Sequence, residues 1–198
     1  MEDIIFELKR KLVHISSVVY IFIYYFLEKL FSRQTALLTL AFILIVLAFV
    51  EFLKMRYHRE IPLFRHIYRE EERNSLSGSI YLIIGVIIAL ALFEFNIAVT
   101  AILMMIFGDS ASALIGRHGN HRIKHLRVTW EGVIAEFLVD LSVGFIFLNN
   151  IFMILIMALT ATIVEATLKP VDDNLGIPVA AGFAGQALMI ILRFLGLI

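Results

Sequence analysis

The sequence contains no cysteine and carries no excess of charge of either sign. Without cysteine, the chain can form neither a disulfide nor a thiolate site. Its 17 basic and 17 acidic residues give a net charge of zero, which argues against a nucleic acid as partner. The patterns G-x-x-x-x-G-K-S/T and G-x-G-x-x-G are also missing, so we expect neither a Walker-type loop nor a dinucleotide-binding fold.

Apolar residues are in large excess. Of the 198 residues, 61% are hydrophobic and 17% are charged, and the mean hydropathy is +0.92. Soluble domains are typically about 45–50% apolar and about a quarter charged. Because the excess runs along the whole chain, we expect an all-α integral membrane protein, with residues 1–198 forming a single polytopic membrane domain. The N-terminus has no secretory pattern, so we expect the first hydrophobic segment to remain in the mature protein.

Seven segments are long and apolar enough to be transmembrane helices, which need about 20 mostly apolar residues. They are residues 12–27, 35–53, 78–94, 97–115, 131–148, 151–168 and 178–196. Pro170 is expected to end the sixth helix, and Pro178 to begin the seventh at a position that favours proline.

The distribution of basic residues predicts the orientation of these helices. Fourteen of the 17 Lys and Arg residues lie at the N-terminus and in the loops 54–77, 116–130 and 169–177, all on one side of the predicted membrane. Cytoplasmic loops carry such an excess. We therefore expect a cytoplasmic N-terminus, an external C-terminus and the polar apparatus on the cytosolic face.

The first candidate site residue is Asp109, at the cytoplasmic end of the fourth predicted helix. An acid at membrane depth is costly unless it is paired or faces a cavity, so such residues are functional candidates. The alternative is a helix-end acid that reaches water or pairs with a nearby Arg. Small residues surround it and permit close approach of a ligand or of another helix; they are Gly108, Ser110, Ala111, Ser112, Ala113 and Gly116.

A basic loop, RHGNHRIKHLR, follows this helix. Its basic residues suit a polyphosphate, but they also satisfy the ordinary cytoplasmic excess of positive charge; they are Arg117, Arg122, Lys124 and Arg127. The histidines His118, His121 and His125 leave open a zinc site, which the glycine in the loop disfavours because it interrupts a helix.

Further acids lie in and after the fifth and sixth predicted helices. Glu131 opens a helix, where a carboxylate complements the macrodipole. Glu136 and Asp140 share one helical face, which indicates a water-filled cavity, a metal-linked site or interhelical hydrogen bonds. Asp172, Asp173 and Asn174 offer oxygen ligands for Mg²⁺ but are also ordinary turn residues. Glu165 can pair with Lys169 four residues later.

Four blocks occur in order along nearly the whole chain. The first is E-x-x-R-K-x-x-H, at Glu7, Arg10, Lys11 and His14. The second is E-x5-G-x-x-Y, at Glu72, Gly78 and Tyr81. The third contains Gly108, Asp109, Ala113 (with Ala111 nearby) and Gly116, followed by T-x-E-G at Thr129, Glu131 and Gly132. The fourth is E-x7-D-N-x-x-x-P, at Glu165, Asp173, Asn174 and Pro178.

Together these blocks resemble the family of dolichol kinases, phytol kinases and CTP-dependent diacylglycerol kinases. The family usually has K-S/T-x-E-G-S in its third block, whereas this chain has Val128 at the lysine position and Val133 at the serine position. Arg127 can supply the charge, although Arg and Lys are not interchangeable. The third block is also similar to that of the CDP-diacylglycerol synthases, but those continue with a different C-terminal signature.

The resemblance implies transfer of the γ-phosphoryl group of CTP to the hydroxyl of a membrane isoprenoid alcohol, with Mg²⁺ as cofactor. It implies Asp109, Glu131 and Asp173 as catalytic residues, with Asp109 and Asp173 as metal ligands. The residues implied for the nucleotide and its phosphates are Lys11, His14, Arg117, Arg122, Lys124, Arg127, Thr129, Gly132 and Asn174. We expect no nucleic-acid partner and leave open whether the chain forms a homodimer.

Two other functions stay open on the sequence. One is a cytidylyltransferase similar to the CDP-lipid synthases. The other is a small ion-coupled transporter that uses Glu136, Asp140 and Glu165 as an ion or proton path. The expected location is a prokaryotic cell membrane, or an endoplasmic-reticulum-type membrane in a eukaryote, with the site facing the cytosol.

Overall fold

The computed structural model describes residues 11–12, 14–57, 77–124, 126, 128–167 and 172–197. Within these ranges every regular element is helical, and the single β-bridge, between Arg122 and Thr129, lies in a loop. The all-α prediction is therefore confirmed. Several residues named above lie outside the described ranges: Glu7, Arg10, Glu72, His125, Arg127, Lys169 and Pro170.

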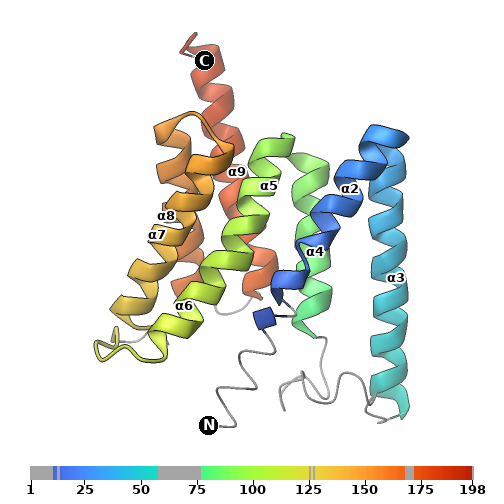
Figure 1. Ribbon diagram of the computed structural model, residues 1–198, viewed down its shortest axis with the longest axis horizontal. Coiled ribbons are helices and arrows are strands. Elements are labelled where there is room, and N and C mark those ends of the chain that lie inside the picture. Colours follow the sequence, from blue (N-terminus) through green and yellow to red (C-terminus); the bar gives the residue numbers. More distant parts are fainter. Residues whose placement is uncertain are drawn as a thin grey trace. The chain divides into compact units, whose positions relative to one another are not determined.

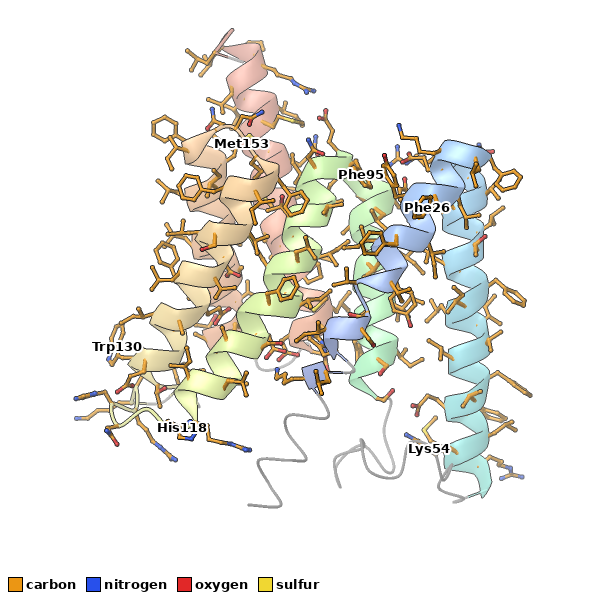
Figure 2. All side chains as sticks on the ribbon, in the orientation of Figure 1. Phe26, Lys54, Phe95, His118, Trp130 and Met153 are labelled. Carbon is orange, nitrogen blue, oxygen red and sulfur yellow. The ribbon has the colours of Figure 1, made fainter. Side chains whose placement is uncertain are left out.

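The chain divides into two compact units, residues 1–87 and 88–198. The first unit contains α2 (Val19–Leu30) and α3 (Arg33–Tyr57), which pack against each other, and α4 (Gly78–Leu92) crosses the boundary. Large apolar side chains such as Phe22, Phe26 and Phe42 are exposed on α2 and α3 (Phe26 is labelled in Figure 2). Exposed apolar surface of this extent is expected where a helix faces lipid.

The second unit begins with one continuous helical rod made of three elements. They are α5 (Phe95–Leu103), the π-helix η2 (Met104–Gly108) and α6 (Asp109–Gly116). The unit continues with α7 (Trp130–Phe147), α8 (Ile151–Thr167) and α9 (Asp173–Phe194). The rod packs on α7 and α9, and α8 packs on both of these helices. The α6–α7 loop and the first turn of α9 lie at the end of the unit opposite to the C-terminus (Figure 1).

Glycine residues allow the helices of the second unit to approach closely. A Cβ atom at Gly144 would lie 2.7 Å from Ile154, and one at Gly182 would lie 2.3 Å from the ring of Phe93. Small residues are enriched where membrane helices pack, because they let backbones come together. The first contact holds α7 against α8, and the second holds α9 against the connection between α4 and α5. Helices α7, α8 and α9 carry most of the acidic side chains discussed below.

Three helices are long and apolar enough to cross a membrane, among the residues that the structure describes. They span Arg33–Arg56, Phe95–Gly116 and Asp173–Phe194, and α4 and α8 are shorter apolar helices. These helices indicate a membrane protein. The fourth, fifth and sixth predicted segments match the observed helices within about two residues at each end, while α2 begins at Val19, well after the predicted residue 12. Seven crossings and their orientation stay predictions.

The prediction that Pro178 begins the last helix is wrong. Helix α9 begins five residues earlier, at Asp173, and Pro178 lies inside it. The reason is that Asp172 caps the helix: its side chain accepts a hydrogen bond from the backbone N–H of Asn174. The earlier start brings Asp173 and Asn174 into the first turn of α9.

Candidate functional site

Three carboxylates from three helices meet near the loop end of the second unit. Asp109 is the first residue of α6, Glu165 lies in the last turn of α8, and Asp173 is the first residue of α9. One oxygen of each residue lies within 4.8 Å of those of the other two. Asp109 is buried, whereas Glu165 and Asp173 are partly exposed. We call these three residues the acidic triad.

Two local features of the backbone position the triad. The π-helix η2 ends at Gly108 and directly precedes Asp109; such wide turns often occur at functional sites. On the opposite side, Asp172 caps α9 and also accepts a hydrogen bond from the Asn174 side chain at 2.7 Å. Burial, followed by repulsion from the Asp173 carboxylate, raises the pKa of Asp172 to about 6.

A second pair of acids, Glu136 and Asp140, projects from α7 into the interior of the unit. Asp140 is 0% exposed and Glu136 is 1% exposed. A Cβ atom at Gly108 would lie only 2.3 Å from Asp140 Oδ1, so the glycine leaves the space that this carboxylate fills. The Ser112 hydroxyl donates a hydrogen bond to Glu136. The pair therefore lies against the same η2–α6 junction that carries Asp109.

The motif T-x-E-G joins the end of α6 to the beginning of α7. The Thr129 hydroxyl donates to the Gly116 carbonyl at 3.1 Å and accepts from the Gly132 N–H at 3.2 Å, which caps α7. A Cβ atom at Gly132 would lie 3.0 Å from the Gly116 Cα atom. These contacts give Thr129, Gly116 and Gly132 a structural role in holding two helix ends together.

Glu131 holds the α6–α7 loop. Its Oε1 atom accepts hydrogen bonds from the backbone N–H groups of Asn120 and His121 and lies 2.7 Å from His121 Nδ1. Gly119 packs on the same carboxylate, because a Cβ atom there would lie 2.6 Å from Glu131 Oε2. His118 Nδ1 instead lies 3.1 Å from the Leu114 carbonyl oxygen. Figure 2 shows His118 and Trp130 at this end of the unit.

The structure brings some of the predicted site residues together and separates others. Asp109 and Asp173 meet in the acidic triad, and Asn174 follows directly in α9. Thr129, Glu131 and Gly132 lie at the α6–α7 loop, where Arg117, Arg122 and Lys124 are exposed. Lys11, which is buried, and His14, which is partly exposed, belong to the first unit.

Glu165 is a triad residue that sequence reasoning did not assign to the site. Its pairing with Lys169 was the simpler interpretation, and Lys169 lies outside the described residues. The signal was present, because Glu165 is an acid at membrane depth and belongs to the block that also contains Asp173 and Asn174.

The acidic triad has the chemistry of a site for a hard cation. Three carboxylate oxygens from separate elements converge, one from each of Asp109, Glu165 and Asp173. Mg²⁺ prefers such oxygen ligands and usually keeps several of its waters. The partial exposure of Glu165 and Asp173 leaves a side of the triad open to water or to a phosphate.

Proteins of similar sequence include bacterial and archaeal examples. An uncharacterised protein of Rickettsia prowazekii is 28% identical over 196 residues, which cover 90% of this chain and 93% of that protein. The phytol kinase of a Synechocystis species is 33% identical over 120 residues, which cover 55% of this chain and 51% of that enzyme. No protein-family model matches the sequence, and no solved structure matches it.

With a third relative, the aligned region covers about two thirds of both chains. An uncharacterised protein of Methanocaldococcus jannaschii is 31% identical over 137 residues, which cover 67% of this chain and 70% of that protein. At this identity and coverage, the chain belongs to the same family as the archaeal protein.

Proposed function

We propose that this protein is a lipid-alcohol kinase that transfers the γ-phosphoryl group of CTP to the hydroxyl of a membrane isoprenoid alcohol. The acidic triad is the observation that carries the proposal, because it offers a site for Mg²⁺ at the loop end of a helical membrane unit. The partial likeness to a phytol kinase supports the same reaction class. The excess of basic residues in the predicted cytoplasmic loops supports a site that faces the cytosol.

Phosphoryl transfer depends mainly on positioning and on neutralising charge. Asp109, Glu165 and Asp173 would hold a Mg²⁺ ion, which would supply positive charge to offset that of the nucleotide phosphates. The open side of the triad, formed by Glu165 and Asp173, is where we place the triphosphate. Asn174 follows Asp173 in the first turn of α9; one N–H of its side-chain amide donates to Asp172, and we assign the other to a phosphate oxygen.

The lipid hydroxyl is the nucleophile in this proposal. Its oxygen forms a bond to the γ-phosphorus while the bond to the leaving CDP breaks, and a carboxylate accepts the hydroxyl proton. Asp109 is our choice for that carboxylate, since it is buried where α6 begins and is the triad member furthest from solvent. The lipid chain would lie among the apolar helices and bring its hydroxyl to the loop end of the unit.

The α6–α7 loop is proposed to contact the nucleotide rather than the metal ion. Arg117 follows Asp109 by eight residues of nearly continuous helix, which is about 12 Å along the axis. Exposed Arg122 and Lys124 extend the positive charge beyond that point. Glu131 keeps the loop folded through the His121 and Asn120 contacts, so its proposed contribution is to position the basic side chains.

The test is transfer of radiolabel by the purified full chain in detergent. Wild-type protein is incubated with γ-labelled CTP or ATP and with polyprenol, phytol or diacylglycerol. We expect label in one of the isoprenoid alcohols, more from CTP than from ATP, and loss of transfer in Asp109→Asn. Glu94→Gln is the matched control, because it makes the same carboxylate-to-amide change next to Phe95, at the opposite end of the unit (Figure 2).

Failure of wild type to label any of these lipids would contradict the kinase proposal. Full activity of Asp109→Asn would contradict the assignment of that residue. Transfer of label from α-labelled CTP would instead indicate cytidylyl transfer, the related alternative.

An ion-coupled transporter is the second candidate function. The enclosed acids Glu136 and Asp140 favour it, since buried acids in membrane helices mark ion and proton pathways. It predicts ion-dependent solute uptake into vesicles that is lost in Asp140→Asn and that needs no nucleotide. The acidic triad, which lies near one end of the unit and is partly exposed at Glu165 and Asp173, is better explained by a kinase site.

A further inference from the structure

The side chain of Asp140 is enclosed without a partner among the described residues. It is 0% exposed, and both of its carboxylate oxygens are buried and accept no hydrogen bond. A buried carboxylate is strongly disfavoured unless it is paired, hydrogen-bonded or bound to a metal. A divalent cation ligated by these oxygens would supply the missing compensation.

The carboxylate of Asp140 faces the acidic cluster rather than an isolated part of the core. Its Oδ1 atom occupies the space left by the missing side chain of Gly108, the residue before Asp109. It interacts electrostatically with Glu165, and Glu136 interacts in the same way with Asp109, Asp140 and Asp173. The α7 pair thus adjoins the triad on its interior side.

One divalent cation at the triad would compensate only part of the negative charge that the acids of this region can carry. The triad and the α7 pair contribute five carboxyl groups within one region of the second unit. Carboxylate oxygens with a neighbouring hydroxyl, here that of Ser112, are hard ligands suited to Mg²⁺ or Mn²⁺. Adjacent pairs of such ions bound by shared carboxylates are a recurrent arrangement in phosphoryl-transfer sites.

We propose that Glu136 and Asp140 bind a second divalent cation next to the acidic triad. The Asp140 carboxylate provides its principal ligand, Glu136 provides another, and Glu165 lies between the two ions. This inference rests on the proposed function only in taking the triad as the site of the first ion. This second, inner ion holds the α7 carboxylates against the η2–α6 junction. The first, outer ion at the triad is then free to engage the nucleotide.

The test counts bound metal without measuring activity. Purified full-length protein is stripped with chelator and titrated with Mn²⁺, and free Mn²⁺ is measured by electron paramagnetic resonance, with Mg²⁺ as competitor. We expect two Mn²⁺ ions per wild-type chain and magnetic coupling between them, because adjoining carboxylates bind both. Asp140→Asn and Glu136→Gln should each bind one ion with no coupling.

The variants separate the two sites. Asp173→Asn should lose the outer ion and keep the inner one, whereas Ser142→Ala, an exposed position on the same helix α7, should behave as wild type. One ion per wild-type chain, or two ions without coupling, would overturn the inference even if the variants failed to fold. Unchanged binding in Asp140→Asn would also overturn it.

These results are independent of the kinase proposal. A kinase with a single ion at the triad would refute only the second site. Two coupled ions in a protein that transfers no label would refute the proposed reaction and leave the second site standing.

Discussion

Replacing Gly108 by alanine tests whether this glycine exists to accommodate Asp140. At an open helical position, Gly→Ala stabilises a protein by about 0.4–1 kcal/mol, chiefly because the unfolded chain loses freedom. At Gly108 the new Cβ atom would lie 2.3 Å from Asp140 Oδ1 and 3.1 Å from its Cγ atom. Asp140 cannot turn outward to relieve this contact without leaving an enclosed site, since it is 0% exposed.

The expected magnitude follows from these two opposing contributions. Overpacking a buried position costs about 1–3 kcal/mol. With mid-range values of about 2 kcal/mol for overpacking and about 0.7 kcal/mol for the gain from alanine, Gly108→Ala should lower the free energy of unfolding by about 1–2 kcal/mol. For a chain of this length, the midpoint of thermal unfolding should fall by about 2–8 °C. Circular dichroism of the protein in detergent measures this shift.

A double-mutant cycle identifies the cause. In an Asp140→Ala background the clash is removed, so Gly108→Ala should be neutral or stabilising there, with a coupling energy of about 1 kcal/mol or more. Two results would refute the reasoning: stabilisation by Gly108→Ala in the wild-type background, or equal destabilisation in both backgrounds.

Three further predictions concern contacts that hold the helices of the second unit together. Thr129→Val removes the cap of α7 and the bond to the Gly116 carbonyl, and should lower the unfolding free energy by about 1 kcal/mol in thermal unfolding; no change would show that the cap is dispensable. Gly182→Ala should cost about 1–3 kcal/mol because the Cβ atom meets the buried ring of Phe93. Gly185→Ala is its control on α9 and should cost less, because the Cβ atom meets the flexible side chain of Met157; the reverse order would contradict the packing argument. Arg193→Ala removes the exposed two-point ion pair with Glu94 and should cost under about 1 kcal/mol, an effect that high salt should reduce.

The helical membrane character of the chain could be predicted from hydropathy alone. Long apolar runs specify helices in a bilayer because every backbone polar group must be satisfied within the segment. The fourth to sixth helices were placed well for this reason. Helix beginnings were less predictable: at α9 the capping side chain of Asp172 decides the start, and it outweighs the nearby proline.

The acidic triad was only partly predictable. Asp109 was predicted because an acid at membrane depth is costly without a partner or a cavity, and Asp173 because it offers an oxygen ligand and belongs to a block that resembles the kinase family. Glu165 was assigned to a local pair, since a sequence shows which residues are four apart but not which helix ends converge. Hydropathy also gives no sign of the π-helix η2 that directly precedes Asp109.

The α7 acids and the T-x-E-G motif also show that spacing in the sequence does not reveal which groups a side chain contacts in the fold. Helical spacing correctly placed Glu136 and Asp140 on one face, yet the enclosure of Asp140 against Gly108 depends on the packing of α7 on η2. For the T-x-E-G motif, Thr129 was expected to contact the nucleotide and Glu131 to be catalytic. The structure shows Thr129 bonded to the Gly116 carbonyl and the Gly132 N–H, and Glu131 bonded to the backbone of Asn120 and to His121.

The most direct test of the proposed function compares transfer of label from the γ-phosphate of CTP with transfer from its α-phosphate. The purified protein is given an isoprenoid alcohol with CTP labelled at either the γ- or the α-phosphate, and the lipid is extracted and counted. Our account predicts lipid label from γ-labelled CTP alone, lost in Asp173→Asn and retained in Glu94→Gln. Lipid label from α-labelled CTP, no lipid label from either form, or full activity of Asp173→Asn would contradict it.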